Sequence, residues 1–496
     1  MAPRLYMKTL PRQSLLALSI LLASCSLVGP DYVKPDTNVP AQWAYAQSAK
    51  VSSSQEDISA WWRKLGDDTL SSLIDDTLKA SPDLRLAQAK LREARARLDL
   101  AKGNLLPTLS ASVDASRSRG SAATGSGSTN NLFKAGFDVS WEADVFGGIR
   151  RGVEAAENDL AAIHADLYNT HLSLAAETAL NYVLLRSSQS RLTIAINNLQ
   201  TQTETLQITE WREQAGLATA VEVEQARTSM EQTRASIPSL QSSAAEAENR
   251  LAILLGDPPA SLRDRLQQSA GLPQLPDQVA AGIPAETLRQ RPDIRAAEFR
   301  LIAETARVGQ QTAELYPGFT LGGNFGWQAL TLGALGNSGT VASALLAGVS
   351  QTVFDGGRIR SRINVQNAIQ EQALVTYEKT ILTALEEVEN ALASYGNSRQ
   401  RQDALRRAAV SAENAAVLAR QRFESGLIDF QSVLDTERTR LAVEDSLASS
   451  EADGLSSLIT LYKSLGGGWS EDFSTTSDYV TKTKKVNATS VESAQP

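Results

Sequence analysis

Hydrophobic residues along this chain follow two different periods in alternating stretches. Within residues 82–107, Leu84, Leu91, Leu98 and Leu105 recur every seventh residue, which predicts a helix with one apolar stripe. Over 109–115 and again over 133–141, apolar and polar residues alternate one by one, which is typical of β-strands with one apolar face. A loop rich in glycine and serine separates the two alternating stretches. The pattern therefore predicts a β-hairpin over residues 108–146.

The same order of patterns returns in the second half of the chain. Residues 292–317 align with 82–107 at an offset of 210 without a gap, and nine of the 26 paired positions are identical. Unrelated segments of average composition would share roughly two. A second pair of alternating stretches predicts a hairpin over 318–354. We interpret the chain as a duplicated unit, with repeat 1 over 57–270 and repeat 2 over 271–469.

Each predicted hairpin is followed by a diglycine turn and a long stretch without proline. Residues 148–215 and 357–425 predict helices about 100 Å long at about 1.5 Å per residue. Each helix ends at a Gly-Leu pair, after which 217–255 and 427–465 predict return helices that pack as an antiparallel coiled coil. Helical periodicity also extends over 57–80.

The two ends of the chain have a different character. Residues 1–24 combine basic residues with a short apolar run and predict a secretory signal peptide, followed directly by Cys25 in Leu-Ala-Ser-Cys. Cys25 is the only cysteine, so no intrachain disulfide forms. Residues 25–56 predict an extended arm, and residues 470–496 predict a disordered tail. An ordinary signal peptide with an incidental cysteine is the alternative interpretation.

The predicted strands place aromatic residues on one face and small polar residues on the other. Phe133, Phe137 and Trp141 alternate with Asp138 and Ser140, which is typical of outer-membrane barrel strands. A soluble sandwich would give the same pattern for one hairpin. Four strands are too few to close a barrel, and hydrocarbon does not tolerate open edges, so this interpretation requires a dimer, trimer or tetramer.

Composition excludes several other classes of function. The net charge is −8 and no basic stripe exists, so we expect no nucleic-acid partner. His164 and His171 lie seven residues apart without a carboxylate at ligand spacing, and we interpret them as ordinary helix residues. We therefore expect no catalytic residues, no metal and no cofactor, and we predict that the chain is not an enzyme.

Several motifs along the chain resemble one family. They are Cys25 with Gly29-Pro30-Asp31-Tyr32, Trp61-Trp62, Pro82-Asp83-Leu84, Trp141-Glu142-Ala143-Asp144-Val145-Phe146-Gly147, Phe354-Asp355-Gly356-Gly357, Arg422-Phe423-Glu424-Ser425-Gly426-Leu427 and Leu465-Gly466-Gly467-Gly468-Trp469. On these motifs the chain resembles the TolC-like outer-membrane factors, in the lipoprotein branch that serves tripartite efflux pumps.

The resemblance implies an α+β membrane protein that forms a homotrimer. Four strands per chain would contribute to a 12-stranded β-barrel in the outer membrane, above a long antiparallel α-helical tunnel in the periplasm. It also implies lipidation at Cys25 and two protein partners, a periplasmic adaptor and an inner-membrane efflux transporter. The expected function is a passive exit duct for drugs or small metabolites. The alternatives are an exit for type I protein secretion and a periplasmic coiled-coil structural lipoprotein.

The resemblance also suggests a gate just after the second Gly-Leu turn. By motif register, Gln431, Ser432 and Asp435 occupy the first turns of the return helix, and Glu222 is near the corresponding position of the first copy. We expect Asp435 to line the narrowest part of the tunnel. The alternative is a solvated carboxylate paired with Arg438 or Arg440.

Overall fold

The computed structural model describes residues 27–470 apart from 53, 55, 126, 268–270 and 277–278. The chain divides into two compact units. Unit 1 contains the residues up to Asp36 together with Lys90–His164 and Ala296–Glu378. Unit 2 contains Thr37–Ala89, Ala165–Arg295 and the residues from Lys379 onward. Each repeat contributes to both units, so the duplication does not correspond to two separate domains. The predicted signal peptide, Cys25 and residues 471–496 lie outside the described residues.

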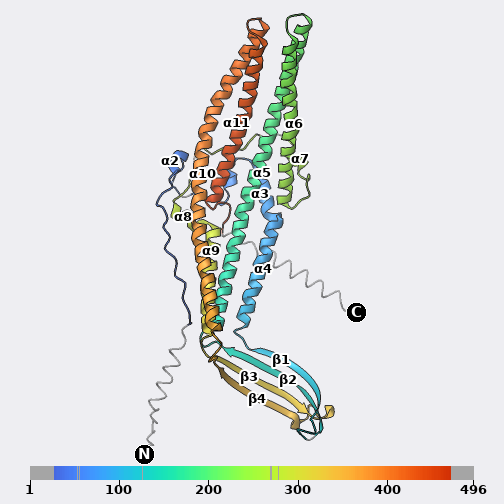
Figure 1. Cartoon of the computed structure of the whole chain (residues 1–496), viewed down its shortest axis with the longest axis vertical. Helices are drawn as coiled ribbons and strands as arrows, with labels where there is room; N and C mark the ends of the chain where they lie inside the picture. The colour runs from blue at the N-terminus through green and yellow to red at the C-terminus, as the bar shows by residue number, and fades with distance from the viewer. Residues whose placement is uncertain are drawn as a thin grey trace, which may run out of the picture. The chain divides into compact units, whose positions relative to one another are not determined.

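Unit 1 holds one antiparallel sheet of four strands in the order β1-β2-β3-β4 (Figure 1). The strands are β1 (Thr108–Arg119), β2 (Thr129–Ala143), β3 (Gly318–Ala329) and β4 (Val341–Ser350). Both predicted hairpins are confirmed. The pairing of β2 with β3 joins the hairpins of the two repeats into one sheet.

The strand register gathers most of the large apolar side chains on one face of the sheet. Phe137 lies opposite Ala111 on β1 and opposite Phe325 on β3, and Trp141 lies opposite Leu321. The other face carries the polar positions. They include Ser110, Ser112, Lys134, Asp138, Ser140, Glu142, Thr320, Asn324 and Gln328. The predicted alternation therefore holds in β1, β2 and β3, whereas β4 is less regular and places Leu346 on the polar face.

Two glycines allow β2 and β3 to approach closely at the centre of the polar face. Gly136 and Gly326 are directly opposite each other. A Cβ added at Gly136 would lie 2.7 Å from the carbonyl oxygen of Phe325, which is shorter than the contacts that Cβ atoms make in proteins. Only residues without a side chain fit at this crossing.

An N-terminal arm lies along the helices of unit 1. Gly29 packs directly against Gly309 of α9 (Pro292–Ala313), where a side chain would clash. The buried Arg151 of α5 (Gly148–Gln214) donates hydrogen bonds to the Val28 carbonyl at 3.2 Å and to the Asp31 carboxylate at 2.6 Å. These contacts fix the start of the arm on its own unit.

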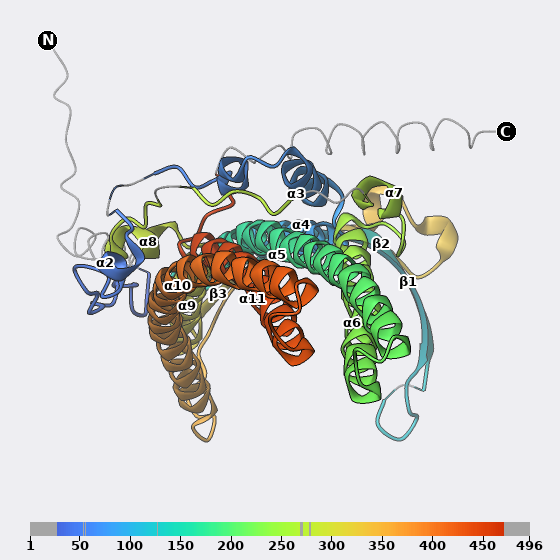
Figure 2. The same cartoon turned by 90° about the horizontal axis from the view of Figure 1, so that it is seen from above.

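The long helices agree with the predicted ones to within a residue or two. They are α5 and α10 (Arg358–Glu424), and the shorter α4 (Pro82–Gly103) and α9 begin with proline as expected. The return helices α6 (Ala220–Leu255) and α11 (Phe430–Ser464) each begin three residues later than predicted. In unit 2, α5 lies between α11 and α6 (Figures 1 and 2).

The predicted helix over 57–80 is wrong in one respect, because it is broken in two. A 3-10 helix η1 (Trp61–Leu65) ends at Gly66, whose φ of 65° is left-handed, and α3 (Asp68–Ala80) begins after it. The Asp67 carboxylate accepts a hydrogen bond from the Leu70 amide at 2.8 Å and starts the new helix. Trp61 and Trp62 are fully buried in the core of unit 2, where Trp61 stacks on Tyr462 at 5.4 Å.

The remaining elements are short. They are α2 (Ala46–Ala49), α7 (Arg263–Leu266), α8 (Pro284–Gln290), η2 (Leu332–Ala334) and η3 (Ser338–Thr340). The helical turn α2 interrupts the arm that was predicted to be extended. No helix in the described part of the chain combines the length and the apolar content needed to cross a membrane.

Candidate functional site

The candidate site lies at the start of α11, where the α10–α11 hairpin reverses. Gly426 has a φ of 72°, and Asp429 caps the new helix. The Asp429 carboxylate accepts hydrogen bonds from the Ser432 hydroxyl at 2.6 Å and from the Ser432 amide at 2.9 Å. These two bonds lower the pKa of Asp429 from its ordinary value. Ser432, one of the predicted gate residues, therefore takes part in the helix cap.

Gln431 and Asp435 stand one helical turn apart on the exposed face of α11. The Gln431 amide donates to the Asp435 carboxylate at 2.9 Å. Val433 and Leu434, on the opposite face, are buried in an apolar cluster. Within the described residues, no ion pair joins Asp435 to Arg438 or Arg440, so Asp435 presents its charge outward beside a neutral amide.

Glu222 occupies the equivalent place at the start of α6 and is engaged in its own helix. Its carboxylate accepts from the Thr219 amide at 2.5 Å and from the Thr219 hydroxyl at 3.0 Å. The Thr219 hydroxyl in turn accepts from the Glu222 amide at 3.3 Å, which completes a capping box. One chain thus places three of the predicted gate residues together on α11 and keeps Glu222 apart on α6.

A buried ionic cluster next to these residues, slightly further along α11, was not predicted from the sequence. The side chain of Glu437 is 8% exposed, and its carboxylate binds Arg420 of α10 at 2.6 Å and Arg440 at 3.0 Å. Burial alone would lower the pKa of Arg440, but Glu437 and the other nearby carboxylates raise it above its ordinary value. The one signal in the sequence was the i, i+3 spacing of Glu437 and Arg440.

The same cluster reaches α5. Arg440 donates to the Asn198 side chain at 3.0 Å, and the Asn198 amide donates to Glu444 at 3.2 Å. Two turns earlier in α5, Arg191 forms a bidentate pair with Asp445 at 2.7 and 3.0 Å. The return helix of repeat 2 is therefore linked by polar contacts to the long helix of repeat 1.

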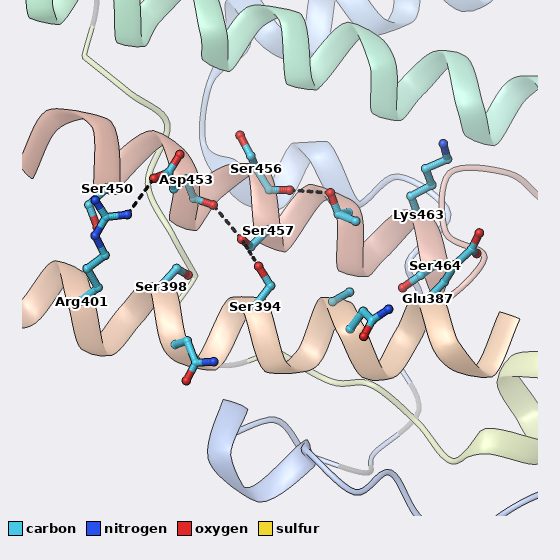
Figure 3. A pocket seen from close by; sticks show the side chains of 14 residues that line it. Glu387, Ser394, Ser398, Arg401, Ser450, Asp453, Ser456, Ser457, Lys463 and Ser464 are labelled. Atoms are coloured by element: carbon cyan, nitrogen blue, oxygen red, sulfur yellow. Dashed lines mark hydrogen bonds and ion pairs between the residues drawn. The ribbon is translucent and has the colours of Figure 1, made fainter. Parts of the chain in front are cut away.

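Further along α11, a polar groove of about 850 Å³ lies between α10 and α11 (Figure 3). Its wall is mostly serine, threonine and asparagine, with Ser394 and Ser457 in contact at 3.1 Å and Arg401 paired with Asp453 at 3.3 Å. Asp453 follows Asp435 by 18 residues, which is about five turns of a straight helix. The groove therefore continues the face of α11 on which Asp435 stands.

The described residues contain no group of three His, Cys, Asp or Glu side chains that could hold a metal ion. His164 and His171 both lie in α5. Burial lowers the pKa of His171 to about 4, so this imidazole is neutral near pH 7.

Comparisons with known proteins agree with this architecture. The family described as "Outer membrane efflux protein" matches residues 73–257 and 283–467, two segments that begin 210 residues apart. The pyoverdine export outer membrane protein OpmQ of Pseudomonas putida is 34% identical over 478 residues, covering 94% of this chain and 99% of that protein. The toluene efflux pump outer membrane protein TtgF, also of Pseudomonas putida, is 31% identical, covering 92% and 96%.

Solved structures show the same fold. The outer-membrane channel OprN superposes with a TM-score of 0.85 at 37% identity, covering 89% of this chain and 99% of that one. The open state of the Neisseria gonorrhoeae MtrE outer membrane channel superposes with a TM-score of 0.77 at 28% identity, covering 90% and 99%. With its repeat, its sheet and both halves matched, this chain belongs to the outer membrane efflux protein family.

Proposed function

We propose that three copies of this chain form the outer-membrane exit duct of a tripartite efflux pump. The observation that carries this proposal is the two-faced sheet, in which the aromatic side chains lie on one face and the polar side chains of β1, β2 and β3 lie on the other. Its outer strands β1 and β4 each leave one edge unpaired within the described part of the chain, and such edges are not tolerated in hydrocarbon. Pairing the edges of three copies gives twelve strands around a polar lumen.

The names of two relatives support a class of cargo and a type of partner for the proposed duct. One relative is named for pyoverdine export and another for toluene efflux. A siderophore and an aromatic hydrocarbon have little chemistry in common, so we assign small molecules as the cargo class and no single substrate. The duct is passive and has no catalytic role, and it receives cargo from an inner-membrane transporter through a periplasmic adaptor. These names favour efflux over protein secretion.

In this proposal the gate is a ring at the start of α11. Three Asp435 carboxylates, each beside a Gln431 amide, converge toward the threefold axis and attract cations. Ser432 shapes the ring through the cap on Asp429. Glu222 holds the matching turn of α6 in place through its capping box. The polar groove between α10 and α11 continues the duct wall beyond the gate.

The ends of the chain complete the proposed arrangement. Residues 1–24 are removed as a signal peptide, and Cys25 becomes the acylated first residue of an arm over 25–56. Repeat 1 (57–270) and repeat 2 (271–469) form the body, and 470–496 is a tail without a packed role. The mature protein is thus anchored in the outer membrane and extends into the periplasm.

Arginine substitutions on the two faces of the sheet test the membrane placement. Phe137→Arg puts a charge on the apolar face, where it costs about 2–4 kcal/mol near the middle of a bilayer. Ser112→Arg puts the same charge on the polar face and should assemble normally. The measurement is the fraction of trimer that survives cold dodecyl sulfate in outer-membrane extracts. Equal assembly of the two variants would contradict the proposed orientation of the sheet.

A further inference from the structure

The apolar face of the sheet contains a groove that the proposed function does not explain. Its volume is about 530 Å³, and its walls are formed by Phe137, Val139, Trp141, Leu321, Phe325 and Leu345. A flat apolar face would be enough to meet lipid. A groove of this size instead provides room for a defined apolar group.

The groove exists because a glycine interrupts the apolar face. Gly323 lies between Val139 on β2 and Leu345 on β4, where the neighbouring positions of that face carry large side chains. Trp141 borders the groove and is held in place, because its indole NH donates to the Leu105 carbonyl at 3.0 Å. The groove therefore has aromatic side chains along its edges, and the Trp141 ring is fixed by its hydrogen bond. None of the described residues in the groove wall is charged.

The N-terminal arm begins at the same end of the sheet as this groove. The Val28 amide donates to the Phe146 carbonyl at 3.2 Å, and Leu27 packs against Gly147. The Phe146 ring lies 6.4 Å from the ring of Phe319, which belongs to the apolar face next to Leu321. The arm therefore contacts a residue whose ring lies beside Phe319, and Phe319 is two residues, or roughly 7 Å along β3, from Leu321 in the groove wall.

We infer that this groove seats a fatty-acyl chain carried by Cys25 of the same protein, an inference that rests on the proposed acylation of that residue. Cys25 precedes Leu27 by two residues, a reach of about 7 Å in extended chain. An acyl chain attached there enters the apolar layer beside the Trp141 end of the groove. The side chains that line the groove are apolar apart from Asn324, and attachment to Cys25 raises the local concentration of this acyl chain above that of any one membrane lipid.

Such a seat gives the anchor a role beyond attachment. The acyl chain would fill the depression at Gly323 and cover the faces of Phe137 and Phe325 across β2 and β3, the two strands that join the repeats. Lipidation would then stabilise the sheet at the junction of the two hairpins. A membrane lipid in the groove would give similar contacts without any dependence on Cys25.

Photocrosslinking distinguishes these occupants in the intact protein. Cells are fed palmitate that carries a diazirine in its chain, the assembled protein is irradiated in its membrane, and the digested peptides are read by mass spectrometry. We expect the Cys25 lipopeptide to be linked to peptides of β2 or β3 that contain Phe137, Trp141, Leu321 or Phe325. Gly323→Leu fills the groove, and the added Cβ would sit 3.2 Å from the nearest backbone oxygen, so the sheet accommodates it with a small shift.

The yield of this link should fall about fourfold for each methylene group that Gly323→Leu displaces. Ala115→Leu adds a side chain to the same face outside the groove wall and should leave the yield unchanged. An acylated Cys25 peptide linked only to phospholipid would overturn the inference, as would an unmodified Cys25. If phospholipid is crosslinked to the same strands with equal yield in the wild type and in Cys25→Ser, a free lipid occupies the groove. That result would also overturn the inference. Drug export by the same strains is measured separately and reports on the proposed function.

Discussion

The two helical hairpins of this chain are copies of each other, and in each an ion pair joins the two helices near the tip. The acidic and the basic partner, however, lie on opposite helices in the two copies. In the first hairpin Glu210 on α5 pairs with Arg227 on α6 at 3.0 Å. In the second hairpin the positions 210 residues later are Arg420 on α10 and Glu437 on α11, which pair at 2.6 Å. The bridge has been kept at the same place while its two charges have changed sides. The position of the ion pair is therefore the same in both copies, whereas the residue types that form it have been exchanged.

The two ion pairs differ more in their burial than in their nitrogen–oxygen distance. Both partners in the first hairpin are exposed, with side-chain exposures of 40% and 48%, whereas that of Glu437 is 8%. One turn further on, the first copy buries Met230 in an apolar cluster, and the second copy has Arg440 there, which binds Glu437. This ionic cluster lies next to Asp435, whose counterpart in the first copy is Gln225. The second hairpin therefore differs from the first in having a buried ionic cluster beside an exposed carboxylate.

Removing the buried carboxylate should have the largest effect. Glu437→Ala leaves Arg420 and Arg440 without their shared partner, and we expect a loss of about 3 kcal/mol of unfolding free energy, the low end for a buried pair because Arg420 is partly exposed. Arg227→Ala, the matched change in the exposed bridge, should cost less than about 1 kcal/mol. Urea unfolding of the detergent-extracted protein, followed by circular dichroism, measures both. Similar losses would mean that burial does not distinguish the two hairpins.

Exchanging the charges of the second bridge sharpens the comparison. Arg420→Glu with Glu437→Arg recreates the order found in the first copy, but it places two arginines side by side at 437 and 440. We expect this double variant to lose about 1–2 kcal/mol through like-charge repulsion. Adding Arg440→Met, the residue of the first copy, should restore most of the loss. If the triple variant unfolds no later in urea than the double variant, Arg440 is not the residue that fixes the direction of the bridge.

A smaller difference between the copies concerns acid. The first copy places His171 where the second buries Ile381. Burial lowers the pKa of His171 to about 4 from 6.5, so the folded protein binds a proton less readily than the unfolded chain. Stability from this site is present above pH 6.5 and is lost as the pH falls from 6.5 toward 4, by about 1 kcal/mol at pH 5 after allowance for partial exposure. His171→Ile should remove that slope between pH 7 and 5, and an unchanged slope would rule out His171 as its source.

Much of the fold could be predicted because the sequence repeats its own pattern. The hairpin at 108–146, the helix at 148–215 and their copies at 318–354 and 357–425 agree with the structure to within a few residues. The return helices begin later than predicted because Thr219 and Asp429 cap them just beyond the Gly-Leu turns. Periodicity alone could not show these caps, since an apolar stripe does not report where backbone amides find acceptors.

The candidate site was only partly predictable. Asp435 and Gln431 stand on an exposed face as their register suggested, but the partners of Arg440 come from α5, α10 and α11. Asn198 and Arg440 are separated by more than 200 residues, and no local spacing signals their contact. The helix predicted from periodicity over 57–80 is broken for a local reason, the left-handed Gly66 followed by the Asp67 cap.

Planar-bilayer recording of the purified trimer tests the central claim most directly. The wild-type protein should form discrete cation-selective conductance steps, because the proposed gate puts three Asp435 carboxylates at the narrowest point of the duct. Asp435→Ala should raise the conductance and lower the preference for potassium over chloride, while Gln225→Ala, the same change at the equivalent position of the first copy, should alter neither. Conductance and selectivity that are the same in wild type and Asp435→Ala would contradict a gate at the start of α11, and a membrane without conductance steps would contradict the duct itself.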